Sequence, residues 1–147
     1  MSAQGPIDTV TLNWQGSLRF EARAGDHSLV LDSERRGGVS PTQALALGLA
    51  GCMGIDVVDI IQKGRFALAG VEARLETERR AEPPRYVTRA TLHFVVRGDV
   101  PPDRVERAIQ LSRERYCSVW HSLRQDIDFR TSFEILPAAH SDDITDR

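Results

Sequence analysis

The feature that most constrains this chain of 147 residues is a long segment without charged side chains, residues 37–55. Ser40 and Gln43 form a capping-box pattern just before it becomes apolar, so a helix is predicted over residues 41–63. Residues 44–55 place apolar or small side chains on every face of that helix. Because a helix that is apolar all round must be covered on all sides, we expect it to be buried.

The rest of the chain consists mainly of strand patterns, in which apolar and polar side chains alternate. A meander of short strands is expected before the helix, and a long hairpin after it. An amphipathic helix, a short helical turn and a last strand are expected to complete the domain. The predicted strands are residues 9–14, 18–23, 28–31, 68–80, 86–97 and 126–136, and the predicted helical segments after the hairpin are 103–116 and 117–123.

These elements predict an α+β domain over residues 1–136, followed by a mobile tail at residues 137–147. About six strands from one chain are expected to form essentially one antiparallel sheet. One sheet covers one side of a helix, and a second copy of the chain could cover the other side. We therefore predict a homodimer in which the long helices pack inside.

Charge and composition exclude several classes of function. The 19 basic and 21 acidic residues are well mixed and give a net charge of −2, which argues against binding of nucleic acid and against a polybasic membrane patch. The apolar run 44–55 is shorter than the roughly 20 residues of a membrane span. The first ten residues lack the pattern of a signal peptide. A soluble cytoplasmic protein is the resulting expectation.

Two cysteines, Cys52 and Cys117, are the best candidates for chemistry. They are too far apart in sequence for a CxxC motif or a zinc knuckle. Cys52 lies about three turns into the helix, where the helix dipole has little effect and burial raises the pKa of a thiol. A reactive Cys52 therefore needs a nearby cation, for which the flexible pair Arg35 and Arg36, or else Arg19, are candidates. The alternative is that Cys52 is an inert core thiol.

Cys117 is predicted to lie at a helix junction, where the start of the next helix could stabilise a thiolate. His121 follows one turn later, but a surface histidine is the simpler interpretation of it. Asp56 shares the helix face of Cys52, where its charge would oppose a thiolate, so we expect it to face solvent or to bind another chain. No metal site is predicted from these residues.

Several segments carry a further signal. They are residues 40–45 (SPTQAL), 49–58 (LAGCMGIDVV) and 60–61 (II) of the predicted long helix, and residues 116–119 (YCSV) around the second cysteine. In these segments the chain resembles the OsmC/Ohr-like family. The order of predicted elements also fits over residues 8–136. The DVV ending of the second segment is more similar to the OsmC-like subgroup than to the best-known peroxidases. The resemblance implies an intertwined α+β homodimer with two equivalent sites at the interface.

The resemblance also implies a function, the thiol-dependent reduction of organic hydroperoxides without a metal or cofactor. Cys52 would be the peroxidatic thiolate and Cys117 the resolving thiol, with a dithiol reductant, for example of lipoyl type, as partner. The arginine of the family would be Arg36 or else Arg35. The family glutamate, nine residues before the first cysteine, is Gln43 here. A glutamine can hydrogen-bond an arginine but cannot neutralise it.

Two other functions remain open at the level of sequence. The same dimer could bind a hydrophobic ligand or sense redox state, with Gln43 marking weak catalysis. It could also be a purely structural dimer with two core cysteines.

Overall fold

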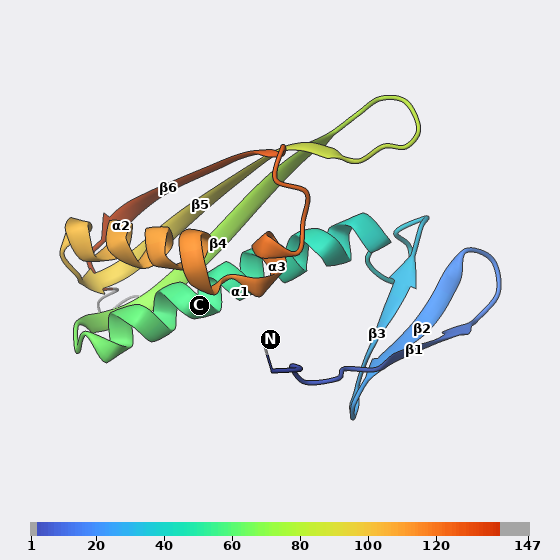
Figure 1. The fold of residues 1–147 in the computed structure, drawn as a ribbon, viewed down its shortest axis with the longest axis horizontal. Coiled ribbons are helices and arrows are strands. Elements are labelled where there is room, and N and C mark those ends of the chain that lie inside the picture. The colour runs from blue at the N-terminus through green and yellow to red at the C-terminus, as the bar shows by residue number, and fades with distance from the viewer. Residues whose placement is uncertain (1–2, 139–147) are drawn as a thin grey trace, which may run out of the picture. The chain divides into compact units, whose positions relative to one another are not determined.

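The computed structural model describes residues 3–138 and has the α+β class expected from the sequence. The predicted tail falls largely on residues 139–147, which lie outside the described residues. Figure 1 shows the elements in chain order. They are β1 (Val10–Trp14), β2 (Arg19–Ala24), β3 (His27–Asp32), α1 (Pro41–Lys63), β4 (Ala67–Arg79), β5 (Val87–Asp99), α2 (Pro102–Leu111), the π-helix η1 (Ser112–Tyr116), α3 (Ser118–His121) and β6 (Asp128–Leu136).

The strands form two separate three-stranded sheets, which corrects the expectation of one sheet. The chain divides between Leu45 and Ala46 into two compact units, and each unit contains one of the sheets. In the first unit, β1, β2 and β3 form an antiparallel meander. Its register places Trp14 opposite Phe20, and Phe20 opposite Leu31, so the apolar side chains of neighbouring strands share one face.

The loop after β3 is built around the buried carboxylate of Asp32. This carboxylate accepts hydrogen bonds from the backbone N–H groups of Glu34, Arg36 and Gly37, at 2.9, 3.3 and 2.9 Å. Arg19 on β2 completes the cluster with an ion pair of 3.2 Å. The segment that carries the two candidate arginines is therefore an ordered turn, whereas the sequence suggested a flexible one.

Asp32 has a pKa lowered to about 2, because the backbone N–H groups of Gly37 and Glu34, and then Arg19 and Arg36, stabilise its charged form against burial.

The capping box at the start of α1 is confirmed. The Ser40 backbone N–H donates to Gln43 Oε1 at 2.9 Å, and the Gln43 backbone N–H donates to Ser40 Oγ at 3.2 Å. These reciprocal bonds satisfy two of the donors that a helix start leaves unpaired. The helix then runs over Pro41–Lys63, the range predicted from the sequence.

The sheet of the second unit has the order β4-β5-β6. The long hairpin β4–β5 is antiparallel as expected, but β6 pairs with β5 in parallel, which corrects the prediction of purely antiparallel sheets. The physical reason is the helical connection α2–η1–α3, which takes the chain back along the sheet before β6 begins. Figure 1 shows α1, α2 and α3 on the same side of this sheet.

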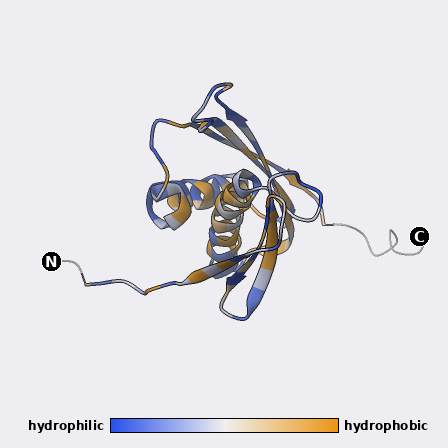
Figure 2. Cartoon of the chain, turned by 90° about the vertical axis from the view of Figure 1, so that its right-hand side faces the viewer, coloured by the Kyte–Doolittle hydropathy of each residue, from blue (hydrophilic) through white to orange (hydrophobic). Residues whose placement is uncertain are grey.

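The core lies between this sheet and the helices. One stripe of α1 is fully buried, and it packs with the inward side chains of β5 and the apolar stripe of α2. In Figure 2 the strands and helices carry hydrophobic and hydrophilic residues side by side, as one-sided burial requires. The main members of the core are Leu49, Met53, Val57, Ile61, Ala90, Leu92, Phe94, Val96, Val105, Ala108 and Ile109.

The expectation that α1 is buried on all sides is wrong for the single chain. Leu47 and Ile55, on the side away from the core, are 61% and 71% exposed. By length and composition α1 resembles a membrane-spanning helix, a property that it shares with core helices of soluble proteins. Its buried stripe makes it a core helix here, with one apolar face left uncovered.

The low pKa of Asp32 predicts how the first unit responds to acid. The stabilisation from its charged form is complete above the ordinary aspartate pKa of about 3.9, and it is lost as the pH falls from there towards 2. We expect Asp32→Asn to be less stable than the wild type at pH 6, and the difference to shrink at pH 2.5. Thermal unfolding followed by circular dichroism at both pH values checks this.

Asp26→Asn, in the exposed turn between β2 and β3, is the matched control and should behave as the wild type. A stability difference for Asp32→Asn that is the same at both pH values would contradict the role given to its hydrogen bonds.

Candidate functional site

The two cysteines, predicted as a pair, are brought together by the second unit. Cys52 is half-buried on α1, beside the buried stripe of that helix. Its Sγ lies 3.8 Å from Oγ of Ser118, the first residue of α3. Cys117 comes just before that residue, and each of the two thiols shifts the pKa of the other. Both cysteines are free thiols.

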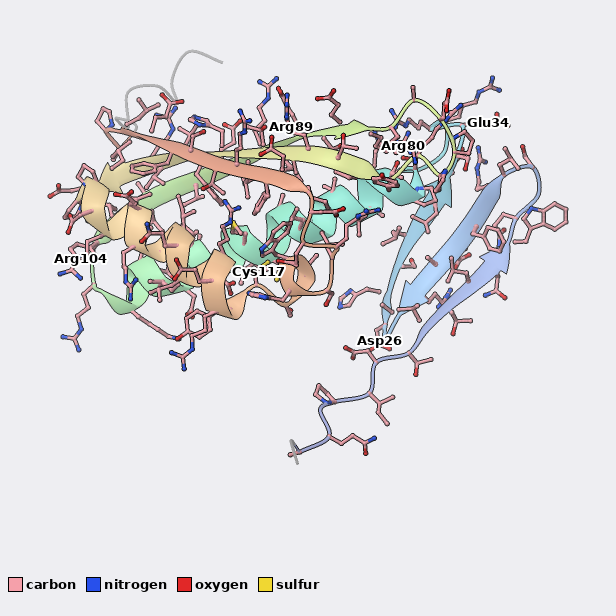
Figure 3. All side chains as sticks on the ribbon, turned by 45° about the horizontal axis from the view of Figure 1, so that its top comes forward. Asp26, Glu34, Arg80, Arg89, Arg104 and Cys117 are labelled. Atoms are coloured by element: carbon pink, nitrogen blue, oxygen red, sulfur yellow. The ribbon has the colours of Figure 1, made fainter. Side chains whose placement is uncertain are left out.

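Cys117 is fully buried at the junction between η1 and α3. Its backbone N–H donates to the Ser112 carbonyl oxygen at 2.7 Å, and its Sγ accepts from the Trp120 backbone N–H at 3.4 Å. Figure 3 labels Cys117 where this segment lies against α1. The sequence predicted a helix junction here, and the structure confirms it.

The surroundings of Cys52 favour its thiolate. Burial raises the pKa of this thiol, but the backbone N–H of Val119, the Cys117 thiol and the Ser118 hydroxyl all donate towards the sulfur and together lower the pKa below its ordinary value. The charge of Asp56 opposes them. The start of the short helix α3 thus supplies donors to a sulfur on a different helix.

The surroundings of Cys117 have the opposite effect. Burial raises the pKa of Cys117 to about 11, and its hydrogen bond to Cys52 and the charges of Cys52 and Asp56 add to the rise, although the Trp120 N–H acts against it. The site therefore pairs a partly exposed thiol whose pKa is lowered with a buried thiol whose pKa is raised. The first suits a nucleophile and the second a resolving thiol.

Asp56 is one turn beyond Cys52 and is partly buried. Its Oδ2 accepts a hydrogen bond of 2.8 Å from Oγ of Ser112, which is fully buried. The sequence does not predict Ser112 as a partner of Asp56, because no local pattern links two residues 56 positions apart.

The other predicted site residues belong to the first unit and have partners there. Arg36 pairs with Glu34 at 3.6 Å and is largely exposed, and Arg19 pairs with Asp32. Arg35 has a positive φ of 59° in the turn before α1. Gln43 uses its side-chain oxygen in the capping box. That one of these arginines contacts Cys52 stays a prediction.

Ser118 and Val119 also belong to the site, and the sequence analysis gave them no role beyond the segment 116–119. Both directly follow Cys117, so the signal was adjacency to a cysteine at a predicted helix start. His121 is exposed, in agreement with its simpler interpretation. Within residues 3–138, no group of three or more histidine, cysteine or acidic side chains is placed to hold a metal ion.

Comparison with known proteins identifies the class. The family model "OsmC-like protein" matches residues 32–132, and the chain belongs to this family. Among curated relatives, protein YhfA of Escherichia coli K12 is 37% identical over 130 residues, which cover 86% of this chain and 97% of YhfA. The resemblance predicted from the two cysteine segments and the long helix is thus confirmed.

Solved structures show the same fold. A hypothetical protein from Aquifex aeolicus VF5 superposes with a TM-score of 0.86 at 23% identity, over 92% of this chain and all of that one. An organic hydroperoxide resistance protein OsmC from Legionella pneumophila superposes with a TM-score of 0.68 at 17% identity, over 90% and 99% of the two chains.

The hydrogen bonds at Cys52 predict the effect of removing Ser118. We expect Ser118→Ala to raise the pKa of Cys52, because one donor to the thiolate is lost. The rate of Cys52 alkylation by iodoacetamide at pH 7 should fall about twofold to tenfold, as for one hydrogen bond of ordinary net strength. The rate is measured against pH, with the modified cysteine identified by mass spectrometry.

Ser132→Ala is the control, since Ser132 is an exposed serine that binds His93 on the other face of the sheet. An alkylation profile of Ser118→Ala that overlays the wild type would show that the hydroxyl contributes nothing to thiolate stability.

Proposed function

We propose that this protein is a thiol-dependent peroxidase that reduces organic hydroperoxides through a two-cysteine cycle. The observation that carries the proposal is the pairing of two cysteines with different surroundings. Cys52 is partly exposed and has a lowered pKa, whereas Cys117 is buried, has a raised pKa and directly precedes Ser118, whose Oγ lies 3.8 Å from the Cys52 sulfur. Membership in the OsmC-like family supports a redox or peroxide-related function. The name of the Legionella protein, which has the same fold, points to organic hydroperoxides as the class to test.

The first step is attack of the Cys52 thiolate on the distal oxygen of the hydroperoxide. The O–O bond breaks, an alkoxide leaves and takes up a proton to become an alcohol, and Cys52 becomes a sulfenic acid. In the second step the Cys117 sulfur attacks the Cys52 sulfur. A disulfide forms, and the hydroxyl group of the sulfenic acid leaves as water with the proton of the Cys117 thiol.

An external dithiol closes the cycle. One of its thiolates attacks the disulfide and releases one cysteine as a thiolate. The second sulfur of the dithiol then attacks the first and releases the other cysteine, so that both cysteines return to the reduced state. The net reaction converts hydroperoxide and dithiol to alcohol, water and a cyclic disulfide. We place the protein in the reducing cytoplasm, where small dithiols, including lipoyl groups, are the class of reductant that this exchange requires.

Arg36, or else Arg35, has a supporting role in this proposal. A guanidinium close to Cys52 would add a positive charge to the hydrogen bonds that already stabilise the thiolate. Gln43 stands where the family has a glutamate, and its side-chain oxygen already accepts from the Ser40 N–H. In the structure Arg36 has Glu34 as its acidic partner, at 3.6 Å. Gln43 would offer a guanidinium at Cys52 no charge, which favours a slower peroxidase.

The same observation supports a second candidate function. If the arginine is not anchored by a charged partner, the site could work as a redox sensor or as a hydrophobic-ligand site rather than as an efficient enzyme. Slow oxidation without turnover by any dithiol would favour this candidate over the peroxidase.

We further propose that the working form is a homodimer that buries the exposed side of α1. This side forms an apolar depression of about 610 Å³ with β4. The glycines Gly51 and Gly54 line it beside Leu47 and Ile55, so another backbone could approach closely. The first unit also exposes large apolar side chains on its sheet, which are Val10, Leu12, Trp14, Phe20 and Leu29.

A second copy of the chain is the simplest partner for both surfaces. Clusters of exposed large apolar side chains on two parts of one chain are unusual for a monomer. A two-fold axis would let the same surfaces of two copies cover each other. In such a dimer the interface would lie next to α1, the helix that carries Cys52.

The peroxidase is tested by counting thiols. We expect one equivalent of cumene hydroperoxide to remove both free thiols of the reduced protein within seconds to minutes, and hydrogen peroxide to react more slowly. Cys52→Ser should abolish the reaction, because no nucleophile remains. Cys117→Ser should stop at a sulfenic acid, which dimedone traps on Cys52. Thiol titration and mass spectrometry measure these products.

Arg36→Ala and Arg35→Ala identify the arginine, with the lysine variants as charge-preserving controls. Replacing the arginine that contacts Cys52 with alanine should slow the loss of thiols without changing the unfolding temperature. Unchanged rates in both would remove the arginines from the mechanism. If the wild type keeps both thiols in excess cumene hydroperoxide, the peroxidase proposal is wrong.

The dimer is tested on the uncovered side of α1. We expect the wild type to have twice the mass of the 16.4 kDa chain in solution, and Ile55→Lys to shift it towards the monomer, because a charge in an apolar interface is costly. Light scattering after gel filtration measures the mass. Gln110→Lys, on the exposed side of α2, should leave it unchanged. A monomeric wild type at micromolar concentration would overturn this proposal.

A further inference from the structure

Ser112 is the residue that links the two cysteines through the protein framework. Its hydroxyl donates to Asp56 on α1, at 2.8 Å, and its carbonyl oxygen accepts from the Cys117 backbone N–H, at 2.7 Å. Asp56 follows Cys52 by one helical turn. Through its hydroxyl and its carbonyl oxygen, Ser112 therefore connects α1, which carries Cys52, to the backbone of Cys117.

The local backbone shows that this connection is specific. α2 ends at Leu111, and Ser112–Tyr116 continue as a π-helix. A π-helix is rare and marks a local departure from the α-helical hydrogen-bond pattern, often at functional sites. Here the wider turn ends with the bond from the Cys117 N–H to the Ser112 carbonyl oxygen, five residues back, and so sets where the Cys117 side chain leaves the helix.

The negative charge of Asp56 is unfavourable for the chemistry of the two cysteines, so its presence in the site calls for a structural reason. A carboxylate near both sulfurs makes each of them harder to ionise, which is a disadvantage at a site that uses a thiolate. Ser112 is 0% exposed, so its hydroxyl is removed from bulk solvent and is expected to have a hydrogen-bond partner, which here is Asp56. By accepting this hydrogen bond, Asp56 holds the segment before Cys117 against α1.

We propose that Ser112 and Asp56 are positioning residues that fix the distance and orientation between the Cys52 and Cys117 sulfurs. They act through the backbone of Cys117 and the turn of α1 that carries Cys52, and they touch no substrate. The proposal deepens the proposed two-cysteine cycle and rests on it for its biological use. The geometric claim can be tested without any peroxide.

The test measures how readily the Cys52–Cys117 disulfide forms in a dithiothreitol redox buffer. Loss of the Ser112 hydroxyl should lower the equilibrium constant for the disulfide about tenfold or more, because a misplacement of about 1 Å can cost about a hundredfold in an intramolecular reaction. Ser112→Ala removes the bond, whereas Ser112→Thr keeps the hydroxyl and should stay within about threefold of the wild type. Ser132→Ala is the matched surface control.

Asp56 variants separate the charge from the bond. Asp56→Asn keeps an oxygen acceptor for Ser112 but loses the charge, so the alkylation profile of Cys52 should move to lower pH while the disulfide equilibrium, corrected for thiol ionisation, stays near the wild type. Asp56→Ala loses both and should lower the equilibrium as Ser112→Ala does. Unfolding temperatures of all variants show whether a loss comes from global destabilisation.

Each result decides the claim. A Ser112→Ala protein that remains folded and forms the disulfide as readily as the wild type overturns it, and so does a Ser112→Thr protein that is as impaired as Ser112→Ala. A tenfold loss restored by threonine supports it, even if the protein proves inactive towards hydroperoxides. Failure of the peroxidase proposal would instead appear as wild-type thiols that form the disulfide in the redox buffer but resist cumene hydroperoxide.

Discussion

The contact between α1 and the segment Ser112–Val119 is the interaction on which the site depends. It places backbone and side-chain donors from one segment on a sulfur that belongs to another helix. Without that contact Cys52 would be a half-buried thiol in an apolar helix, with a raised pKa and little reactivity. The same contact buries Cys117 and keeps its proton in place. One packing interaction thus gives two identical side chains different properties.

This contact in turn requires the second unit to be assembled as it is. The buried stripe of α1 packs on the sheet β4-β5-β6, and α2 packs beside it, so that η1 and α3 come to lie along α1. Because the connection between β5 and β6 is helical, β6 enters the sheet in parallel. The parallel pairing and the site are therefore consequences of the same crossover, which carries Cys117 over the face of the sheet.

The first unit contains a defined turn directly before α1. Asp32 organises that turn by accepting backbone hydrogen bonds, and the capping box then starts the helix. Arg35 and Arg36 lie in this turn, so their backbone is held while the side chain of Arg36 stays largely exposed. The uncovered apolar sides of α1 and of the first sheet are the observation on which the proposed homodimer rests.

The sequence by itself determined the α+β class, the limits of α1 and its capping box, the amphipathic α2, and the two cysteines as the candidate pair. These follow from local patterns, because capping and hydrophobic periodicity act between residues close in the chain. Only the tertiary structure decided the split into two sheets, the parallel pairing of β6, the Ser112–Asp56 bond and the donors around Cys52. Those depend on groups more than 50 positions apart, or on which strand edges meet, and no local pattern specifies such pairs.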